Sequence, residues 1–306
     1  MIFRYKQLQQ HPAIFLKVTG LQLFEFEDLL DDVLPRFAQT ERQRLNRPDR
    51  KRGLGAGQKA ELDSLNQVLL TVVWLRLYLV HDVLGYLFGI SQPTVGRYIS
   101  RVLPVLEAAG RDTMRMPDPG RKRRRSLDRL LQEIPELAVI VDSFEQKVQR
   151  PTDKDKRDKW YSGKKKSHTM KSQIAVDGQT GRIVAVADSV TGRTSDINLL
   201  KQSGLLDQLP PGIGCTGDLG YQGIQKLHSL GFCPRKKPRD KPRPAEDTLY
   251  NRAFAQFRIL VENTINRLRR YQALTATDRH HRQRHSMRVM AVAGLVNIQM
   301  LYRLAA

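Results

Sequence analysis

The chain has 306 residues, with 52 Lys and Arg against 31 Asp and Glu, which gives a formal net charge of +21. Forty per cent of the residues are hydrophobic, which is enough to bury a core and excludes a wholly disordered chain. The two cysteines exclude a disulfide scaffold and a four-cysteine zinc module, and the apolar stretch 68–75 is too short to span a membrane.

The positive charge is concentrated in the second part of the chain. Residues 1–120 hold 16 basic and 13 acidic side chains, which leaves 36 basic and 18 acidic side chains for residues 121–306. Most of the excess lies in four stretches, 121–125, 147–171, 235–243 and 267–288. Such a balance favours a polyanionic partner, although charge alone does not separate DNA from RNA or an anionic membrane. Because the first residues lack the apolar core of a signal peptide, we expect a soluble, cytoplasmic protein.

The first predicted elements are helices. Residues 62–79 have apolar side chains at helical spacing and predict a buried amphipathic helix. Residues 81–103 then have the features of a helix-turn-helix. Gly85 allows two helices to approach closely, Gly89 suits a helix C-cap, and Ser91 can cap the start of the next helix.

The second helix of this pair would carry the contacts to DNA. Its outward side chains near the start are Ser91, Gln92, Thr94, Arg97 and Arg101, at the place where a recognition helix meets base edges and phosphates. An ordinary helical hairpin would show the same pattern. The agreement in register of the glycines, the cap and the apolar positions favours DNA binding.

A domain boundary is predicted near residues 117–120, where Pro and Gly precede a run of basic residues. Arg123 and Arg124 in that run are candidate DNA contacts, and a solvated linker is the alternative. The predicted division is a helical N-terminal domain over 1–116 with its helix-turn-helix at about 62–104, a basic linker over 117–130, and a second domain over 131–306.

In the second domain the sequence predicts alternating strands and helices. The expected elements are a short strand over 137–143 that ends in Asp142, two strands over 173–177 and 182–187, a helix over 196–209, a strand end with Asp218 in the Gly-rich stretch 214–223, and a long helix over 249–271 that holds Glu262.

Three carboxylates stand out in this domain: Asp142, Asp218 and Glu262. On the long helix, Glu262 shares a polar stripe with Arg258 and Arg269, and a surface array of ion pairs is the usual interpretation of such a stripe. If the three carboxylates converge, they repel one another and need a cation between them, which a hard divalent ion such as Mg²⁺ supplies.

Two other stretches leave alternatives open. Trp160 and Tyr161, close to Lys164–Lys166, could stack on a splayed base or anchor a hairpin. His281 and His285 have the spacing of neighbours on a helix. Since no Cys or carboxylate partners lie nearby, a basic phosphate-facing segment is favoured over a zinc site.

These residues resemble the DDE-superfamily transposases of bacterial insertion sequences, in the branch related to eukaryotic Harbinger elements. The resemblance spans about residues 50–303 and rests on the stretches 141–145, 149–151, 161–166, 168–169, 217–223 and 258–270. It implies an α/β fold, with an RNase-H-like mixed sheet flanked by helices and preceded by an all-α helix-turn-helix domain.

The resemblance also implies residue roles. Asp142, Asp218 and Glu262 would be both the catalytic acids and the metal ligands, with Mg²⁺ or Mn²⁺, two ions per site, as cofactor. Arg258 and Glu262 match a Tyr, Arg, Glu and Lys signature of many related transposases, whereas Ala255 and Arg269 depart from it. Further DNA contacts are expected at Lys164, Lys165, Lys166, His168, Arg258 and Arg269. A helper role is open for Asp196, which follows Thr194 and Ser195 where some relatives have a His-Asp pair.

The implied function is a DNA transposase that binds the terminal inverted repeats of an insertion sequence and catalyses metal-dependent strand cleavage and strand transfer. Its partners would be double-stranded DNA of the element ends and the target, and a second copy of the chain in a homodimer or larger synaptic complex, with no membrane. It would act at the bacterial nucleoid. The alternatives are a domesticated DNA-binding protein without catalysis, and an RNase-H-like nuclease.

Overall fold

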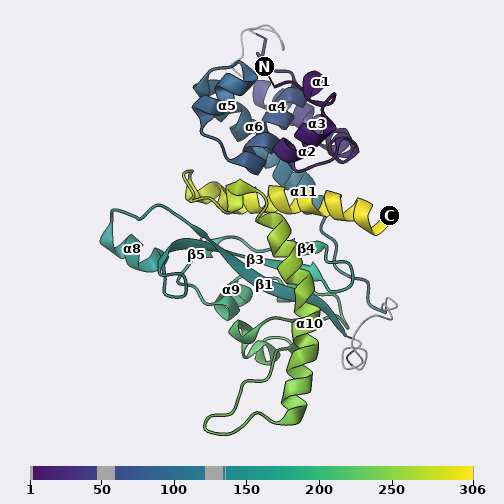
Figure 1. Cartoon of the computed structure of the whole chain (residues 1–306), viewed down its shortest axis with the longest axis vertical. Helices are drawn as coiled ribbons and strands as arrows, with labels where there is room; N and C mark the ends of the chain where they lie inside the picture. The colour runs from purple at the N-terminus through teal and green to yellow at the C-terminus, as the bar shows by residue number, and fades with distance from the viewer. Residues whose placement is uncertain (1–2, 47–58, 121–133, 135, 306) are drawn as a thin grey trace. The chain divides into compact units, whose positions relative to one another are not determined.

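The computed structural model describes residues 3–46, 59–120, 134 and 136–305. The chain forms two compact units (Figure 1). Unit 1 comprises Met1–Asp112, Arg270–Leu274 and Met290–Ala306, and unit 2 comprises Thr113–Arg269 and Thr275–Val289. Arg123, Arg124 and most of the predicted basic linker lie outside the described residues. The division into domains at residues 116 and 131 stays a prediction.

Unit 1 is helical. Its helices are α1 (Tyr5–Leu8), α2 (Pro12–Thr19), α3 (Leu23–Leu45), α4 (Ser64–Leu77), α5 (His81–Phe88), α6 (Gln92–Asp112) and the larger part of α11 (His285–Ala305), together with the short η4 (Gln272–Leu274). None of the helices in the described residues is long and apolar enough to cross a membrane.

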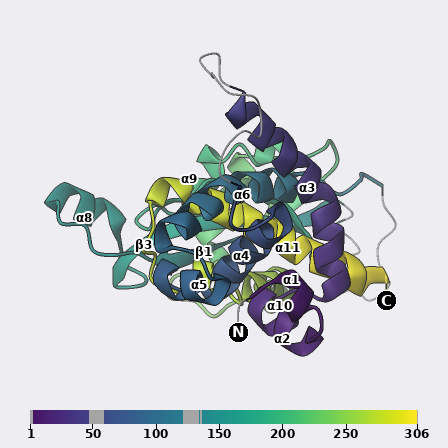
Figure 2. The same ribbon diagram turned by 90° about the horizontal axis from the view of Figure 1, so that it is seen from above.

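The helix α4 is the centre of unit 1. Asp63 caps its start, because the Asp63 side chain accepts a hydrogen bond from the backbone N–H of Asn66. Every residue from Asn66 to Leu75 is buried, since α2, α3, α5 and α6 all pack against this helix (Figure 2). The predicted helix is therefore confirmed, but it is not amphipathic: a helix surrounded on all sides buries all of its faces.

The helices α5 and α6 form the predicted helix-turn-helix. Gly89 has the left-handed φ of 61° that ends α5, and a Cβ on Gly85 would lie 2.6 Å from the carbonyl oxygen of Ile90. Both glycines are thus required by the backbone, as the sequence predicts. On α6, Val95 and Val102 are fully buried, so the apolar side of this helix faces inward.

Unit 2 is built on a mixed sheet. Its strands are β1 (Leu137–Lys147), β2 (Tyr161–Ser162), β3 (Ser167–Asp177), β4 (Ile183–Val186), β5 (Val190–Thr191), β6 (Gly214–Thr216) and β7 (Gly231–Phe232). The order is β2-β3-β1-β6-β7, with β4 and β5 also paired with β3. The strand β1 is antiparallel to β3 and parallel to β6. A mixed sheet flanked by helices, preceded by an all-α region, confirms the predicted fold class.

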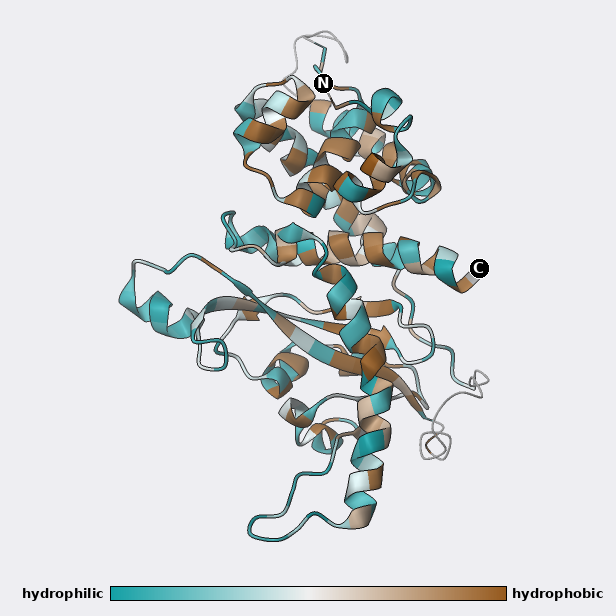
Figure 3. Ribbon diagram, in the orientation of Figure 1, coloured by the Kyte–Doolittle hydropathy of each residue, from teal (hydrophilic) through white to brown (hydrophobic). Residues whose placement is uncertain are grey.

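Helices flank this sheet. They are α8 (Lys154–Trp160), α9 (Asp196–Gln202), α10 (Ala245–Leu268), the first residues of α11, and the short η1 (Leu206–Gln208), η2 (Leu219–Tyr221), η3 (Ile224–Lys226) and η5 (Arg282–Arg284). The long α10 crosses β1 and β3 (Figure 1) and buries the predicted stripe that includes Phe254, Val261 and Leu268. Figure 3 shows α8 as hydrophilic along its whole length, in agreement with its lack of buried residues.

The strand β1 is longer than the sequence predicts. It continues past residue 143 to Lys147, because its pairing with β3 runs from Val139 opposite Asp177 to Lys147 opposite Thr169. Asp142 therefore lies in the middle of the strand and not at its end, which corrects the sequence-based prediction. Side chains alternate between the two faces of a strand. Asp142 faces α10, whereas Ser143 faces α9, as their contacts below show.

Candidate functional site

The first candidate acid, Asp142, is held in a rigid part of the sheet. The residues before it, from Val139 to Val141, are completely buried, because β1 lies between β3 and β6. The Asp142 Oδ1 atom accepts a 2.7 Å hydrogen bond from the backbone N–H of Ser143. Its Oδ2 atom lies 3.7 Å from Nη2 of Arg258 on α10. The mostly buried carboxylate of Asp142 is thus directed toward α10.

The second acid, Asp218, is brought to Asp142 by strand register. The parallel pairing of β1 and β6 ends at Ile140 opposite Thr216. Asp142 lies two residues after Ile140, and Asp218 lies two residues after Thr216. The two carboxylates therefore stand on adjacent segments, just beyond the last paired residues of the two strands. Asp218 caps the start of the short helix η2, because its Oδ1 atom accepts a 2.8 Å hydrogen bond from the backbone N–H of Gly220.

Gly220, in the glycine-rich stretch after β6, has no side chain and therefore leaves space for the carboxylates of Asp196 and Asp218. A Cβ on Gly220 would lie 2.7 Å from Oδ2 of Asp196 and 2.9 Å from Oδ1 of Asp218. Such distances are not tolerated between real atoms without a shift. Gly220 is therefore needed at this position because two carboxylates crowd around its Cα atom.

The third acid, Glu262, stands on α10 and is more exposed than Asp142. Its side chain is 55 % exposed, and its Oε1 atom lies 3.5 Å from Nη2 of Arg258, one helical turn earlier. The same guanidinium nitrogen therefore lies close to both Asp142 and Glu262. Within the described residues, the buried Nε atom of Arg258 makes no hydrogen bond. Arg258 thus connects two of the three acids.

The electrostatics of Asp142 reflect this crowding. Burial is the largest cause that raises the pKa of Asp142 to about 6, and the charges of Asp218 and Asp196 act in the same direction. The N–H of Ser143 and the charge of Arg258 act in the opposite direction. The carboxylates of Asp218 and Asp196 are therefore close enough to disfavour the ionisation of Asp142. This mutual repulsion is what a divalent cation would relieve.

The acid Asp196, at the start of α9, is held by a second set of contacts. It accepts a 2.6 Å hydrogen bond from the Ser143 hydroxyl and forms a 2.8 Å ion pair with Lys171 on β3. Lys171 also lies 3.7 Å from Glu145. Burial opposes the ionisation of Asp196, but the hydrogen bonds from Lys171 and Ser143 outweigh it and lower its pKa. Lys171 and Glu145 are not among the predicted site residues, although Glu145 shares a face of β1 with Ser143 and lies opposite Lys171 on β3.

The donor atoms at this site suit a hard divalent cation, because Mg²⁺ and Mn²⁺ prefer carboxylate oxygen. Across residues 3–46, 59–120 and 136–305, however, no group of three or more His, Cys, Asp or Glu side chains is placed to hold a metal ion. The position of Arg258 near both Asp142 and Glu262 gives the physical reason. Asp142 lies on β1 and Asp218 follows the neighbouring strand β6, whereas the exposed side chain of Glu262 is turned toward Arg258.

The predicted DNA contacts of the helix-turn-helix do not all face outward. Ser91, Gln92 and Arg97 are exposed, and Arg101 is partly exposed with Glu41 3.9 Å away. Thr94 is only 4 % exposed, which corrects its predicted outward position. Its hydroxyl is hydrogen-bonded to other side chains of unit 1 and does not point to solvent.

The hydroxyl of Thr94 accepts a 2.8 Å hydrogen bond from Nη2 of Arg97 and lies 2.9 Å from the Ser91 hydroxyl. Thr94 also donates to Glu61, 3.3 Å away. Its part is thus to hold Ser91 and Arg97 in place at the start of α6. The exposed Ser91, Gln92 and Arg97 remain the candidates for direct contact.

The other predicted contacts are dispersed over unit 2. Lys164, Lys165 and Lys166 are exposed in the turn between β2 and β3, and Arg269 is exposed at the end of α10. His168 pairs with Tyr161 across the two strands, with ring centroids 5.7 Å apart. Arg258, in contrast, lies at the acids. The structure brings Arg258 to the carboxylates and leaves the three lysines on the surface.

The aromatic residues of this hairpin are engaged within the fold. The guanidinium of Arg282 lies over the Trp160 ring, 4.4 Å from its centroid. Of the two alternatives that the sequence leaves open for Trp160 and Tyr161, these contacts favour the anchoring of the hairpin. The zinc alternative for His281 and His285 does not hold for His285, because both of its ring nitrogens have partners, Ser189 and Gln146.

Comparison with known proteins shows the family to which this chain belongs. The family model of the DDE superfamily endonuclease matches residues 141–297, just over half of the chain. The model of the helix-turn-helix of DDE superfamily endonuclease matches residues 60–112. Over 252 residues the chain is 29 % identical to a probable transposase for insertion sequence element IS702 from Microchaete diplosiphon, covering 82 % of this chain and 86 % of that protein. No solved structure matches the chain.

The matched ranges contain the features described above. The endonuclease match begins at Val141 in β1 and ends within α11, so it includes Asp142, Asp218 and Glu262. The helix-turn-helix match ends with α6 at Asp112. On the strength of these matches, the chain belongs to the DDE superfamily of endonucleases and carries the helix-turn-helix of that superfamily.

Proposed function

We propose that this protein is a DNA transposase, which binds the terminal inverted repeats of an insertion sequence and catalyses strand cleavage and strand transfer. The similarity to the probable insertion-sequence transposase extends over 86 % of the length of that protein. The observation that carries the proposal is the register of β1 and β6, which sets Asp142 beside Asp218, with Glu262 linked to Asp142 through Arg258.

In this proposal the helix-turn-helix reads the element ends. Ser91, Gln92 and Arg97 are exposed at the start of α6, where a recognition helix contacts base edges in the major groove. Thr94 orients Ser91 and Arg97 through its hydroxyl. Further phosphate contacts would come from Arg101, Arg123, Arg124, Lys164, Lys165, Lys166, His168 and Arg269.

The chemistry would depend on divalent metal, as it generally does in DDE superfamily endonucleases. Asp142, Asp218 and Glu262 would hold Mg²⁺ or Mn²⁺, two ions in each site. A divalent ion held by these acids would supply positive charge at the scissile phosphate and would favour deprotonation of a water molecule or of a 3′-hydroxyl. Asp142 and Asp218 are held in place by the backbone N–H groups of Ser143 and Gly220.

The residues around the acids would position the DNA. Arg258, which lies at Asp142 and Glu262, would donate hydrogen bonds to a phosphate oxygen, and its unpartnered Nε atom suits that contact. Asp196, held by Lys171 and Ser143, keeps β3 and α9 in place around Asp142. These are binding and orientation roles, so no covalent protein intermediate is needed.

Cutting both ends of an element in concert requires at least two active sites. We therefore expect a homodimer or a larger synaptic complex on the DNA, in the bacterial nucleoid. Inverted repeats close to both ends of the coding region would be the natural DNA substrate.

The test is strand cleavage with Mg²⁺ on duplexes that carry those repeats. Asp142→Ala should abolish cleavage, with the binding of the element ends nearly unchanged. Asp207→Ala is the matched control, because it removes an exposed carboxylate from the same unit. Equal cleavage by wild type and Asp142→Ala would contradict the proposal. Cleavage confined to RNA–DNA hybrids would indicate an RNase-H-like nuclease, and sequence-specific binding without any cleavage would indicate a domesticated DNA-binding protein.

A further inference from the structure

The two candidate acids of the sheet are supported to different degrees. Asp142 lies within β1, which pairs with β3 as far as Lys147. Asp218, in contrast, follows β6, a strand of three residues, and precedes η2, which is equally short. The position of Asp218 relative to Asp142 therefore depends on the groups that hold this short segment against β1 and β3.

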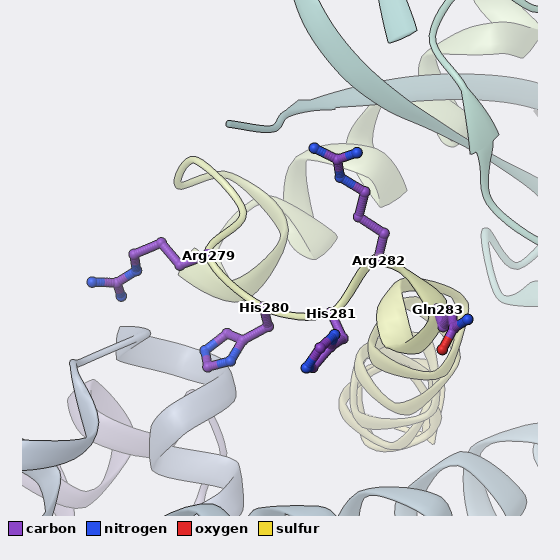
Figure 4. A pocket seen from close by; sticks show the side chains of 5 residues that line it. All are labelled: Arg279, His280, His281, Arg282 and Gln283. Carbon is purple, nitrogen blue, oxygen red and sulfur yellow. The ribbon is translucent and has the colours of Figure 1, made fainter. Parts of the chain in front are cut away.

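The strand β1 is also held just beyond its end. The backbone N–H of Asp278 donates a 2.8 Å hydrogen bond to the carbonyl of Lys147. Asp278 forms a 2.7 Å ion pair with Arg288, and both side chains are 1 % exposed. Arg282, in the segment 279–283 that lines a surface pocket (Figure 4), donates a 3.0 Å hydrogen bond to the carbonyl two residues after β1. These contacts make β1 and β3 a fixed frame to which other parts of unit 2 can be attached.

A buried group of charges lies on the face of this frame that Ser143 occupies. Glu145 and Lys171 stand opposite each other on β1 and β3, and their side chains are 5 % and 7 % exposed. Glu145 accepts a 2.6 Å hydrogen bond from the Thr169 hydroxyl, within the same pair of strands. Buried charges cost free energy unless they are paired. Lys171 lies 3.7 Å from Glu145 and has a second, closer partner.

That partner is Asp196, at the start of α9. Its Oδ1 atom accepts a 2.8 Å hydrogen bond from Lys171 and a 2.6 Å hydrogen bond from the Ser143 hydroxyl. Its backbone carbonyl accepts a 3.2 Å hydrogen bond from the side chain of Gln173, which is also on β3. Donors from both β1 and β3 therefore fix Asp196 on the frame, through its side chain and through its backbone.

Asp196 and Gln173 in turn contact the segment that carries Asp218. The Cβ that Gly220 lacks would lie 2.7 Å from Oδ2 of Asp196, so this oxygen packs closely against the backbone of Gly220. Gln173 donates a second hydrogen bond, of 2.9 Å, to the hydroxyl of the fully buried Tyr221 in η2. The helix α9 packs against both β3 and η2. The frame is thus joined to the residues that directly follow Asp218.

We propose that Asp196 is a positioning residue, which holds Asp218 at a fixed separation from Asp142 so that the two carboxylates can share a divalent cation. Lys171 keeps the Asp196 carboxylate on the frame, and Ser143 links it to the strand that carries Asp142. Asp196 acts through the segment that follows Asp218, and it is not required to touch the DNA or the reacting atoms. The inference rests on the proposed function for the identity of the cation-binding acids.

The first test compares two hydroxyl groups that each donate a 2.6 Å hydrogen bond to a carboxylate on this face. Ser143→Ala removes the donor to Asp196, and Thr169→Val removes the donor to Glu145. Neither change alters a charge, so an effect on cation binding has to come from geometry. Loss of a group that supports metal ligands costs roughly tenfold to hundredfold in metal affinity or activity. In calorimetry on the metal-free full chain, Ser143→Ala should therefore weaken Mn²⁺ binding about tenfold or more, whereas Thr169→Val should leave it unchanged.

Urea unfolding separates this role from a purely structural one. Thr169→Val leaves the Glu145 carboxylate without its hydroxyl donor, whereas in Ser143→Ala the Asp196 carboxylate keeps Lys171. Thr169→Val should therefore be the less stable variant and Ser143→Ala the weaker Mn²⁺ binder. The inference is overturned if Ser143→Ala binds Mn²⁺ as wild type does, or if the loss of affinity follows the loss of stability in both variants.

A second pair of variants tests Lys171. Lys171→Met with Glu145→Gln removes one charge of each sign and leaves Asp196 without its ion pair. The matched control is Arg235→Met with Asp247→Asn, which removes a surface ion pair of the same 2.8 Å length. We expect the affinity for Mn²⁺ to fall about tenfold in the first variant and to stay at the wild-type value in the control. Equal affinities in the two variants would overturn the role of Lys171.

Cleavage of a duplex that carries an element end completes the test. With saturating Mn²⁺, Ser143→Ala should cut this element-end duplex about tenfold more slowly in a single turnover, with the same dissociation constant for the DNA as wild type. If Mn²⁺ affinity changes as expected but the wild-type chain cleaves no DNA, the proposed function fails and the positioning role of Asp196 stands. If the wild-type chain binds no Mn²⁺, both fail.

Discussion

The guanidinium of Arg258 lies 3.7 Å from the carboxylate of Asp142. One residue of α10 thereby connects the long helix to the central strand of the sheet. The same nitrogen lies 3.5 Å from Glu262, so a positive charge stands between two acids that would share a metal ion. The contact has two consequences: it partly relieves the repulsion among the acids, and it competes with a cation for them.

Replacement of Arg258 by Met tests this competition. Ion pairs of this partly exposed kind contribute up to about 1 kcal/mol, so their loss should tighten Mn²⁺ binding by about fivefold or less, measured by calorimetry. Strand cleavage should nevertheless fall, because the phosphate loses a hydrogen-bond donor. Arg252→Met, six residues earlier on α10, is the matched control and should change neither quantity. Weaker Mn²⁺ binding by Arg258→Met would contradict the prediction.

Asp142→Asn should stabilise the metal-free protein at pH 7. The pKa of Asp142 in the folded chain is about 6, above the ordinary value of 3.8, so ionisation of this carboxyl favours the unfolded state. The penalty is absent below pH 3.8, grows between pH 3.8 and 6, and is complete above pH 6. Asn keeps the acceptor for the N–H of Ser143 and carries no charge.

The shift of about two pKa units corresponds to a gain of up to about 3 kcal/mol at pH 7. Urea unfolding of Asp142→Asn and wild type at pH 4 and pH 7, both in EDTA, measures the difference. It should be large at pH 7 and close to zero at pH 4. A difference that is constant with pH would show that burial of the charge is not its cause.

Gly220→Ala should disturb the acids and leave the fold intact. The added Cβ would lie 2.7 Å from Asp196 and 2.9 Å from Asp218, in both cases from a carboxylate oxygen. These side chains can move, so the protein should still fold, while cleavage should decrease by at least tenfold because the acids are displaced. Gly163→Ala is the control, since its added Cβ meets nothing within 4 Å. Normal cleavage by Gly220→Ala would contradict this account of the site.

Gly85→Ala should destabilise the helix-turn-helix. Its Cβ would lie 2.6 Å from the backbone oxygen of Ile90, which cannot move without changing the turn between α5 and α6. We expect a loss of roughly 2–4 kcal/mol in unfolding free energy and, with it, loss of binding to the element ends. The measurements are thermal unfolding and fluorescence anisotropy with the element-end duplex.

Gly96→Ala provides the comparison on the neighbouring helix. Its Cβ would have ordinary contacts, the nearest 3.6 Å away on His81, and Ala favours a helix over Gly by up to about 1 kcal/mol. This variant should be as stable as wild type or more stable. If Gly85→Ala and Gly96→Ala behave alike, the close approach at Gly85 is not what the turn requires.

Local backbone requirements made much of the fold predictable. Gly85 and Gly89 are required by the turn itself, within a few residues of chain, so the helix-turn-helix could be recognised from its sequence. Asp142 and Asp218 could be selected because each follows a short apolar stretch of strand. Their proximity depends on the parallel register of β1 and β6, which joins residues more than 70 positions apart and cannot be obtained from periodicity.

The sequence by itself determined the helix-turn-helix, the candidate acids and the concentration of positive charge after residue 120, because these depend on residue type and short-range spacing. Only the tertiary structure decided that Thr94 is buried, that Arg258 stands between Asp142 and Glu262, and that Asp278 and Arg288 pair in the interior. The physical reason is that the environment of a charged or polar side chain is set by the elements that pack around it. Those elements come from distant parts of the chain. The net charge of +21 therefore indicated a polyanionic partner, but it did not show which Lys and Arg side chains form ion pairs within the fold.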